Sequence, residues 1–449
     1  MSGMSPAPSN DRLRALLAEA EWTGGRLAQA VNAVGAEAGL GLRYGRASVT
    51  QWMSGTRPRD PGPALIAEAL SRRLGRSLGI VDTGFEGAED AYWSMDLPAQ
   101  LTELAAAAGT DRQAARRVCV YRLADCRVPG WQEIRDGRIH RGGPSPESGG
   151  PEMELAHTMV RLFSEVDRSH GGGVLRAPAS AFLSHVGGPW CRTPPGDSRR
   201  AEFLGVCSRL AHVCGFMSFD DQAHGPAQRF YRASLRTAAE AGHREEYAWA
   251  LRAMSVQAHD LGHFRQALEL IETAASPRLT VLTRASLAGQ AAVALASTGS
   301  RRRALAELLR AEELLGRAPE TPARPVGSYH PAELSFQRAL VHSHLNDRRA
   351  ALTALRESLA RWPPAERRSR AITLARIAEF ELEQGLLEEA VATAHRFLDD
   401  YSYIRSARIR RFLAGLRARL RPYGNSRAAG ALLHRAVRVA DASTAFSAP

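Results

Sequence analysis

The sequence predicts an all-α protein, in which a small helical bundle is followed by an α-solenoid. Three observations support this fold class. Alanine and leucine dominate the chain while aromatic residues make up only 6% of it, which favours helix over sheet. Apolar residues recur at helical spacing through most of the sequence. Finally, one pattern of turn and alanine residues recurs five times in the C-terminal half, as expected of stacked helical repeats.

The length, composition and charge of the chain limit the kinds of protein it can be and the partners it can bind. With 449 residues it has room for about three domain-sized units. Apolar residues make up 44% and charged residues 24%, which is a globular composition. The net charge is +12, the pI is about 10.2, and every basic residue other than histidine is arginine. This balance favours an acidic partner, such as nucleic acid, over a cationic one.

Cysteine usage and hydropathy predict a cytoplasmic protein. The five cysteines are odd in number and form no C-x-x-C pair, which argues for a reducing compartment. Residues 1–10 have the composition of a disordered lead-in and lack the apolar core of a signal peptide. No apolar run approaches the length of a membrane span, so we expect no membrane partner.

Residues 11–82 have the periodicity of four short helices and form the first predicted domain. The first helix begins at Asp11 and buries leucines at helical spacing. Thr23 can cap the second helix, a connector spans 39–45, and the last helix covers 64–74. This is the size of a small helical DNA-binding domain.

The third of these helices, within residues 46–58, carries the most specific chemical signal. Ser48 can cap it, and its buried stripe leaves Thr50 and Gln51 pointing outward. Gly55 then permits the left-handed turn that ends a helix. Short hydroxyl and amide side chains on an exposed turn are suited to contact base edges in a major groove. The alternative is a short bundle helix that happens to end in glycine and proline.

The order of these residues resembles the helix-turn-helix domain of repressors of the Cro and xenobiotic-response-element type. The resemblance rests on Leu27-Ala28, Ser48-Val-Thr-Gln-Trp, Gly55, Arg57-Pro58 and Ile66 to Leu74. It implies that bases are read by Ser48, Thr50 and Gln51, and that phosphates are held by Thr23, Arg46 and Arg57. The stretch 31–45 is longer than the tight turn of that family, so the angle of the reading helix is expected to differ.

The middle of the chain predicts a tether and a flexible linker. Residues 83–98 are acidic and irregular, a helix follows over about 99–124, and 141–151 is rich in glycine, proline and serine. The remaining predicted divisions are a tether with a helix (83–151), helices that lead into the array (152–200), the array itself (201–421), and a C-terminal cap and tail (422–449).

Five segments share a small or polar turn residue, an alanine five positions later and a small or apolar residue seven further on. They are Gln222/Ala227/Ser234, Gly262/Ala267/Ala274, Gly299/Ala304/Ala311, Asn346/Ala351/Ser358 and Gly385/Ala390/Phe397. The pattern resembles the second helix of a tetratricopeptide unit, although the spacing of 37 to 47 residues exceeds the usual 34. The resemblance implies turn or packing roles for Gly262, Ala267, Gly299, Ala304, Ala351, Gly385 and Ala390.

Residues 401–449 hold ten arginines and one acidic residue. A solenoid needs a terminal helix with a polar outer face, so a capping role is the simpler interpretation. A second nucleic-acid contact is the alternative. The proline-rich insertion at 319–331 lies in the longest repeat interval and could form part of a binding face.

No set of residues assembles a catalytic or metal site, and we predict a protein that is not an enzyme and uses no cofactor or metal. His170-Gly-Gly-Gly lacks a nucleophile motif and is more simply a glycine loop. Cys207, His212 and Cys214 are better explained as core residues than as zinc ligands. The cluster His259, Asp260 and His263 is better explained as a polar turn between helices.

The whole architecture resembles regulators of Streptomyces and its relatives that repress differentiation and antibiotic production. The resemblance includes Pro129 to Ile134, Gly215 to Tyr231, Met254 to Gly262, Ser328 to Pro331 and Leu398 to Tyr401. It implies a regulatory role. We expect a transcriptional regulator that binds double-stranded DNA and whose repeats sense a peptide, protein or small ligand, and a symmetric operator would imply a homodimer. The alternative is a protein–protein adaptor that acts through the repeats without specific DNA binding.

Overall fold

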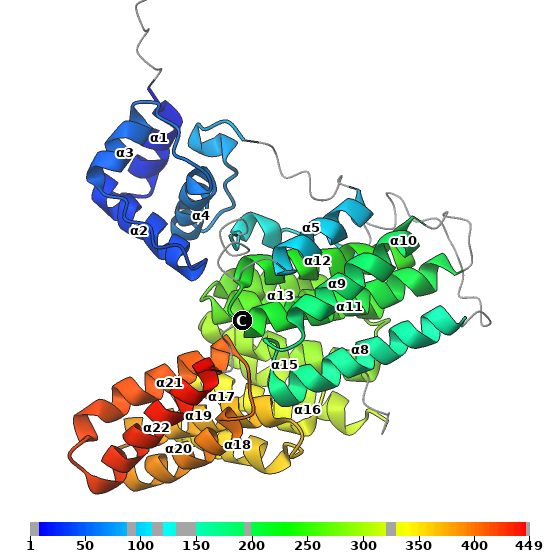
Figure 1. The fold of residues 1–449 in the computed structure, drawn as a ribbon, viewed down its shortest axis with the longest axis vertical. Helices are drawn as coiled ribbons and strands as arrows, with labels where there is room; N and C mark the ends of the chain where they lie inside the picture. The colour runs from blue at the N-terminus through cyan, green and yellow to red at the C-terminus, as the bar shows by residue number, and fades with distance from the viewer. Residues whose placement is uncertain are drawn as a thin grey trace, which may run out of the picture.

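A computed structural model describes residues 9–87, 96–109, 120–131, 150–192, 199–319 and 329–445. All regular secondary structure in these ranges is helical. A small bundle is followed by a longer stack of paired helices (Figure 1). The predicted fold class, a helix-turn-helix-like bundle followed by a tetratricopeptide-like α-solenoid, is therefore confirmed. No helix in the described ranges is both long enough and apolar enough to span a membrane.

The N-terminal bundle consists of α1 (Asp11–Glu19), α2 (Gly24–Glu37), α3 (Arg46–Met53) and α4 (Gly62–Leu74). Thr23 caps α2, because its hydroxyl accepts a hydrogen bond from the Arg26 amide at 3.3 Å. The helices enclose one apolar core, whose most deeply buried members are Leu13, Leu27, Val31, Val49, Leu65, Ile66 and Leu70. A short helix η1 (Val81–Thr83) completes this region.

An ordered connector, residues 38–45, joins α2 to α3. The Asn32 side-chain amide donates to the Tyr44 carbonyl, and its oxygen accepts from the Tyr44 amide, both at 2.9 Å. The Tyr44 ring packs edge-on against Trp52 with centroids 5.0 Å apart. Because α2 continues to Glu37, the connector is shorter than the stretch 31–45 suggested. The asparagine bridge fixes the path into α3, which a glycine-rich connector alone would leave free.

Five antiparallel helix pairs form the array: α11 (Arg200–Asp220) with α12 (His224–Ala241), α13 (Arg244–Asp260) with α14 (Phe264–Ala274), α15 (Val281–Ser297) with α16 (Arg301–Gly316), α17 (Pro331–His344) with α18 (Arg348–Arg361), and α19 (Arg367–Glu383) with α20 (Leu387–Tyr401). Two further helices, α21 (Ala407–Leu420) and α22 (Arg427–Ala445), follow the last pair, with the short η5 (Arg421–Tyr423) between them.

Each pair reverses at the repeated turn residue, which adopts a positive φ in all five cases. The φ angles are 58° at Gln222, 81° at Gly262, 82° at Gly299, 60° at Asn346 and 77° at Gly385. In every turn the next amide donates to the carbonyl four residues before the turn residue, which closes the helix C-terminus. The alanine five positions later is fully buried in four pairs and 1% exposed in the last. A small side chain there lets the two helices approach closely.

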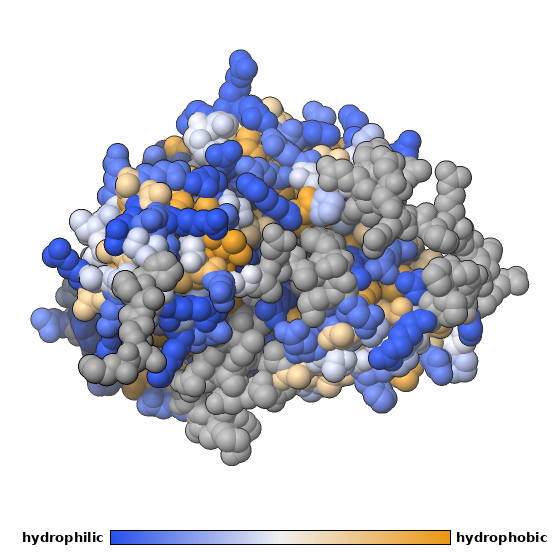
Figure 2. All heavy atoms as spheres, turned by 90° about the horizontal axis from the view of Figure 1, so that it is seen from above, coloured by the Kyte–Doolittle hydropathy of each residue, from blue (hydrophilic) through white to orange (hydrophobic). Residues whose placement is uncertain are grey.

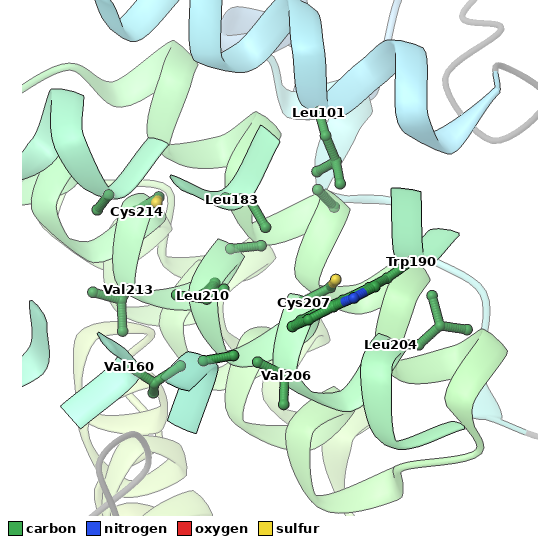
Figure 3. Close-up of a cluster of buried hydrophobic side chains, with 14 of the residues drawn as sticks. Leu101, Val160, Leu183, Trp190, Leu204, Val206, Cys207, Leu210, Val213 and Cys214 are labelled. Carbon is green, nitrogen blue, oxygen red and sulfur yellow. The ribbon is translucent and has the colours of Figure 1, made fainter. Parts of the chain in front are cut away.

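The helices that lead into the array pack around α11. They are α5 (Leu97–Gly109), α8 (Pro151–His170), α9 (Arg176–Phe182), η4 (Leu183–Gly187) and α10 (Gly188–Cys191). Figure 3 shows Cys207, Leu210 and Val206 of α11 among Leu183, Trp190 and Leu101 from the surrounding elements. This apolar cluster seals the N-terminal end of the array.

Several predicted segments fall partly or wholly outside the described residues. These are the lead-in 1–8, residues 88–95 of the acidic tether, residues 110–119 of the helix predicted over 99–124, the linker 141–149 and most of the insertion 319–331. The predicted end of that helix is wrong: residues 120–122 are not helical, because Arg122 is extended and both its amide and its carbonyl bond to the Gln228 side chain. The domain boundaries therefore stay predictions.

The turn geometry predicts opposite effects of alanine at two glycines. Gly385→Ala should lower stability by about 1 kcal/mol, because an alanine at positive φ is strained while the added Cβ meets no atom within 4 Å. Gly415→Ala, within α21, should be neutral or stabilising because alanine favours helix. The thermal midpoints of the full-length variants measure both effects, and equal shifts would contradict the turn assignment.

Candidate functional site

The helix α3 presents its predicted base-reading residues to solvent. Thr50 and Gln51 are exposed, whereas Ser48 is half-buried. The helix begins at Arg46 with Gly45 as its N-cap, so Ser48 is the third helical residue and not the cap. Its hydroxyl accepts from the Gly45 amide at 3.4 Å, which holds the first turn from inside the helix. Ser48 therefore has a structural partner, while Gln51 remains available at the surface.

Exposed arginines surround the start of α3. Arg26, Arg43 and Arg46 are exposed and have no ion-pair partner within the described part of the chain. A Cβ built on Gly24 would lie 3.3 Å from Val49 Cγ1 and 3.9 Å from Arg46 Cγ, so the start of α2 lies against α3. Two short helices thus bring unpaired positive charge to the same edge of the bundle.

The other two predicted phosphate contacts are already engaged. Arg57 pairs with Asp60 at 3.0 Å, and its Nε donates to the Glu86 carbonyl at 3.4 Å. Thr23 serves as the cap of α2. Sequence reasoning did not select Arg26 and Arg43, although their positions in the first turn of α2 and just before α3 are a usable signal.

A second notable region is a set of buried ion pairs inside the array. Arg368 of α19 pairs with Asp167 of α8 at 2.6 Å, and each side chain is 7% exposed. The Arg368 guanidinium also lies 4.6 Å from the Phe216 ring centroid in α11. Burial raises the pKa of Asp167 to about 6, although the nearby Arg368 opposes that shift. Arg368 thus joins the last helix pair to α8 through Asp167 and to the first helix pair through Phe216.

The helix α21 contributes a second set of ion pairs. Arg410 reaches Asp221 at 3.6 Å, and Arg411 reaches Asp260 at 3.3 Å. The Arg405 amide donates to the His170 carbonyl at 2.6 Å, which ties the segment before α21 to the end of α8. We call the contacts of α8, α19 and α21 with one another and with the ends of α11 and α13 the closing contacts. They engage part of the C-terminal arginine run as internal structure.

The residues of the predicted cluster His259, Asp260 and His263 make separate contacts. The Nε2 atoms of His259 and His344 lie 2.9 Å apart, and burial lowers the pKa of His259 to about 4. His263 instead stacks on Tyr121 with centroids 5.6 Å apart, while Asp260 faces Arg411. The cluster expected from the sequence is therefore divided among three different partners.

The cysteine and histidine group of α11 is part of the core. Cys207 and Cys214 are fully buried, and His212 packs edge-on against Tyr231 with centroids 5.7 Å apart. Burial raises the pKa of Cys214 to about 12, so it is held as a thiol. No group of three or more potential metal ligands occurs in the described ranges.

A shallow hollow separates the bundle from the array. It is lined by the end of α2, by Val120 and Tyr121, and by the turn between α11 and α12. His224 lines it and is 7% exposed, and its Nδ1 has no hydrogen-bond partner in the described structure. On the face drawn in Figure 2, hydrophilic side chains predominate and hydrophobic residues form separate small patches.

Comparisons with known proteins give a family match and several solved structures of limited likeness, two of which are described below. The family described as the SP15 N-terminal domain matches residues 13–86, which span α1 to η1. A Rap protein complexed with competence and sporulation factor is 11% identical, with 65% of this chain and 99% of that chain covered and a TM-score of 0.38. The Rap conjugation gene regulator of plasmid pLS20, complexed with the Phr* peptide, is 13% identical over 66% and 96%, with a TM-score of 0.37. No curated protein matches.

The closing contacts predict a large loss of stability when one buried charge is left alone. Asp167→Ala should destabilise the protein by about 3–5 kcal/mol, because Arg368 stays buried without its carboxylate. Arg265→Ala removes an exposed pair whose side chains are 76% and 55% accessible, and should change stability by less than about 0.5 kcal/mol. Chemical unfolding of both full-length variants compares them; a small effect of Asp167→Ala would mean that the contact contributes little.

The buried histidines predict acid sensitivity. Burial lowers the pKa of His224 from 6.5 to about 4, so the folded state binds fewer protons than the unfolded state between these values. Stability should therefore fall as the pH drops from about 6.5 towards 4. His224→Gln should lessen the fall, and His434→Gln, at an exposed position of α22, should not. Thermal midpoints from pH 7.5 to 4.5 test this, and parallel curves for all three proteins would contradict it.

Proposed function

We propose that the protein is a DNA-binding transcriptional regulator whose α3 enters the major groove. The observation that carries the proposal is the surface of α3: Thr50 and Gln51 are exposed, and Arg26, Arg43 and Arg46 nearby have no ion-pair partner in the described part of the chain. Unpaired arginines at the edge of an exposed helix suit phosphate contacts on either side of a groove. In this proposal the arginines position the helix and the polar side chains select the bases.

The dimensions of the bundle support this mode of binding. The eight residues of α3 make a helix about 12 Å long, and a major groove about 12 Å wide admits one helix. Trp52 and Val49 are buried on the opposite face, which anchors α3 to the bundle. The amide group of Gln51 can pair with adenine, and the hydroxyl of Thr50, which donates to the Arg46 carbonyl at 3.1 Å, keeps its acceptor capacity for a base. Ser48 contributes less, since its hydroxyl already accepts from Gly45.

The array is proposed to sense a peptide, protein or small ligand and to regulate the bundle. Stacked helix pairs offer an extended surface for such a partner. A symmetric operator would require a homodimer, in which two copies of α3 read half-sites one helical turn apart. The resemblance noted in the sequence favours genes of development or secondary metabolism as targets.

DNA binding gives the direct test. Full-length protein would be used to select duplexes from a random pool, followed by gel-shift titration at several salt concentrations. Thr50→Ala with Gln51→Ala should reduce the preference for the selected duplex over random sequence by about 1–3 kcal/mol. Arg46→Ala should weaken binding to both duplexes and reduce the salt slope by about 1.

Arg265→Ala is the matched control, since it removes an exposed arginine of α14 that lies outside the bundle. It should leave affinity and salt slope unchanged. Failure of the full-length protein to enrich any sequence, or equal effects of Arg265→Ala and Arg46→Ala, would overturn the proposal. Partner capture that persists in the Thr50 and Gln51 variant would then favour the adaptor function.

A further inference from the structure

The segment of residues 120–131 lies between the bundle and the array, and we call it the strap. Its short helix η3 covers Leu123–Cys126. The strap runs past α12 and α13 before it ends at Trp131 (Figure 1). Its contacts fall into three groups, with the first helix pair, the second helix pair and the bundle. Together they place one short segment across three parts of the molecule.

The first group fixes the strap to α12. The Gln228 side chain accepts from the Arg122 amide at 2.9 Å and donates to the Arg122 carbonyl at 2.8 Å. Arg232 pairs with Asp125 at 2.7 Å, and these side chains are 3% and 7% exposed. A two-way amide bridge and a buried ion pair hold this end to one helix.

The second group fixes the strap to the next helix pair. The Tyr247 hydroxyl donates to the Pro129 carbonyl at 2.5 Å, and its ring packs edge-on against Trp131 with centroids 5.3 Å apart. The Arg244 guanidinium lies 5.2 Å from the Trp131 ring centroid. His263, at the start of α14, stacks on Tyr121. The strap therefore crosses the junction between two repeats, and a change in their relative angle must move it or break one of these contacts.

The third group joins the strap to the bundle through one buried carboxylate. Glu68 of α4 is 2% exposed and accepts from the Leu123 amide at 2.8 Å and from Arg72 Nε at 2.7 Å. Arg72 continues to Glu37 of α2 at 2.7 Å. Val120 packs against the bundle core. A displacement of Leu123 therefore changes its hydrogen bond to Glu68 of α4 and, through Arg72, the contact with Glu37 of α2.

We propose that the strap couples the angle between the first two repeats to the bundle, with Gln228 as the array-side positioning residue and Glu68 as the bundle-side one. Straightening or bending of the array at the α12–α13 junction shifts Leu123 and releases or tightens α4. The coupling itself is a property of the fold. Its consequence for DNA affinity rests on the proposed function, because α2 and α3 pack on the same core as α4.

Hydrogen exchange of the full-length protein tests the coupling without DNA. Gln228→Leu removes both bonds to Arg122 from the array side, and it should speed exchange at 120–126 and across α4 at least tenfold while α12 and α13 keep their protection. Gln290→Leu is the matched control, because Gln290 is also buried in the array and donates to Ser255 Oγ at 3.3 Å. It should leave α4 unchanged.

Release of 120–126 with native exchange in α4 would overturn the proposal. Loss of protection in α12 or α13 would show that Gln228 merely supports the array; Glu68→Gln, made outside the array, then decides. That variant should speed exchange at Leu123 and leave α12 and α13 protected, and a native rate at Leu123 would refute the coupling. Gel shifts of Gln228→Leu test the consequence separately: altered α4 exchange with no DNA binding by any variant would sink the proposed function and leave the coupling intact.

Discussion

The array depends on a reversal of the chain that one residue in each repeat makes possible. A helix that ends in the left-handed conformation returns its chain immediately, and the amide that follows satisfies a carbonyl that would otherwise be unpaired. Three of the five turns use glycine, which adopts this conformation without strain, while Gln222 and Asn346 adopt it with a side chain. The turn residue always lies five positions before a buried alanine of the second helix. The second helix of each pair therefore packs against the first at a small side chain.

Stacking of these pairs leaves the charged ends of several helices near one another, and arginine–carboxylate pairs occupy that region. Asp167, Asp221 and Asp260 are each matched with arginine from a distant part of the chain. Burial of such groups is costly unless both partners are present. The closing contacts therefore make the C-terminal helices part of the array, because removal of one partner would leave a buried charge in the first or last helix pair.

The sequence was sufficient for features that depend on local pattern. Helical periodicity gave the bundle and the array, and the five turn residues could be aligned because their spacing from alanine is constant. It was insufficient for features that depend on tertiary partners. Ser48 resembled a cap, but Gly45 caps α3 because the Asn32 bridge to Tyr44 brings the chain to the helix one turn earlier. The sequence suggested that Arg57 is available for a phosphate, but in the structure Arg57 pairs with Asp60 and donates to the Glu86 carbonyl. The Glu68–Leu123 bond joins residues 55 positions apart, which no periodicity could indicate.

Every ion pair among the closing contacts uses arginine as its positive partner, so a change of pH alters the charge of the carboxylate and not that of the base. A guanidinium keeps its charge throughout the range in which a lysine ammonium would begin to lose it. Alkaline conditions therefore leave the Arg368–Asp167 pair ionised, since the carboxylate is already deprotonated and the guanidinium keeps its proton there. In acid, protonation of the Asp167 carboxylate is the one step that removes a charge from this pair. The charge state of this contact is therefore set by its carboxylate, because arginine is the residue type that the chain uses for every positive side chain other than histidine.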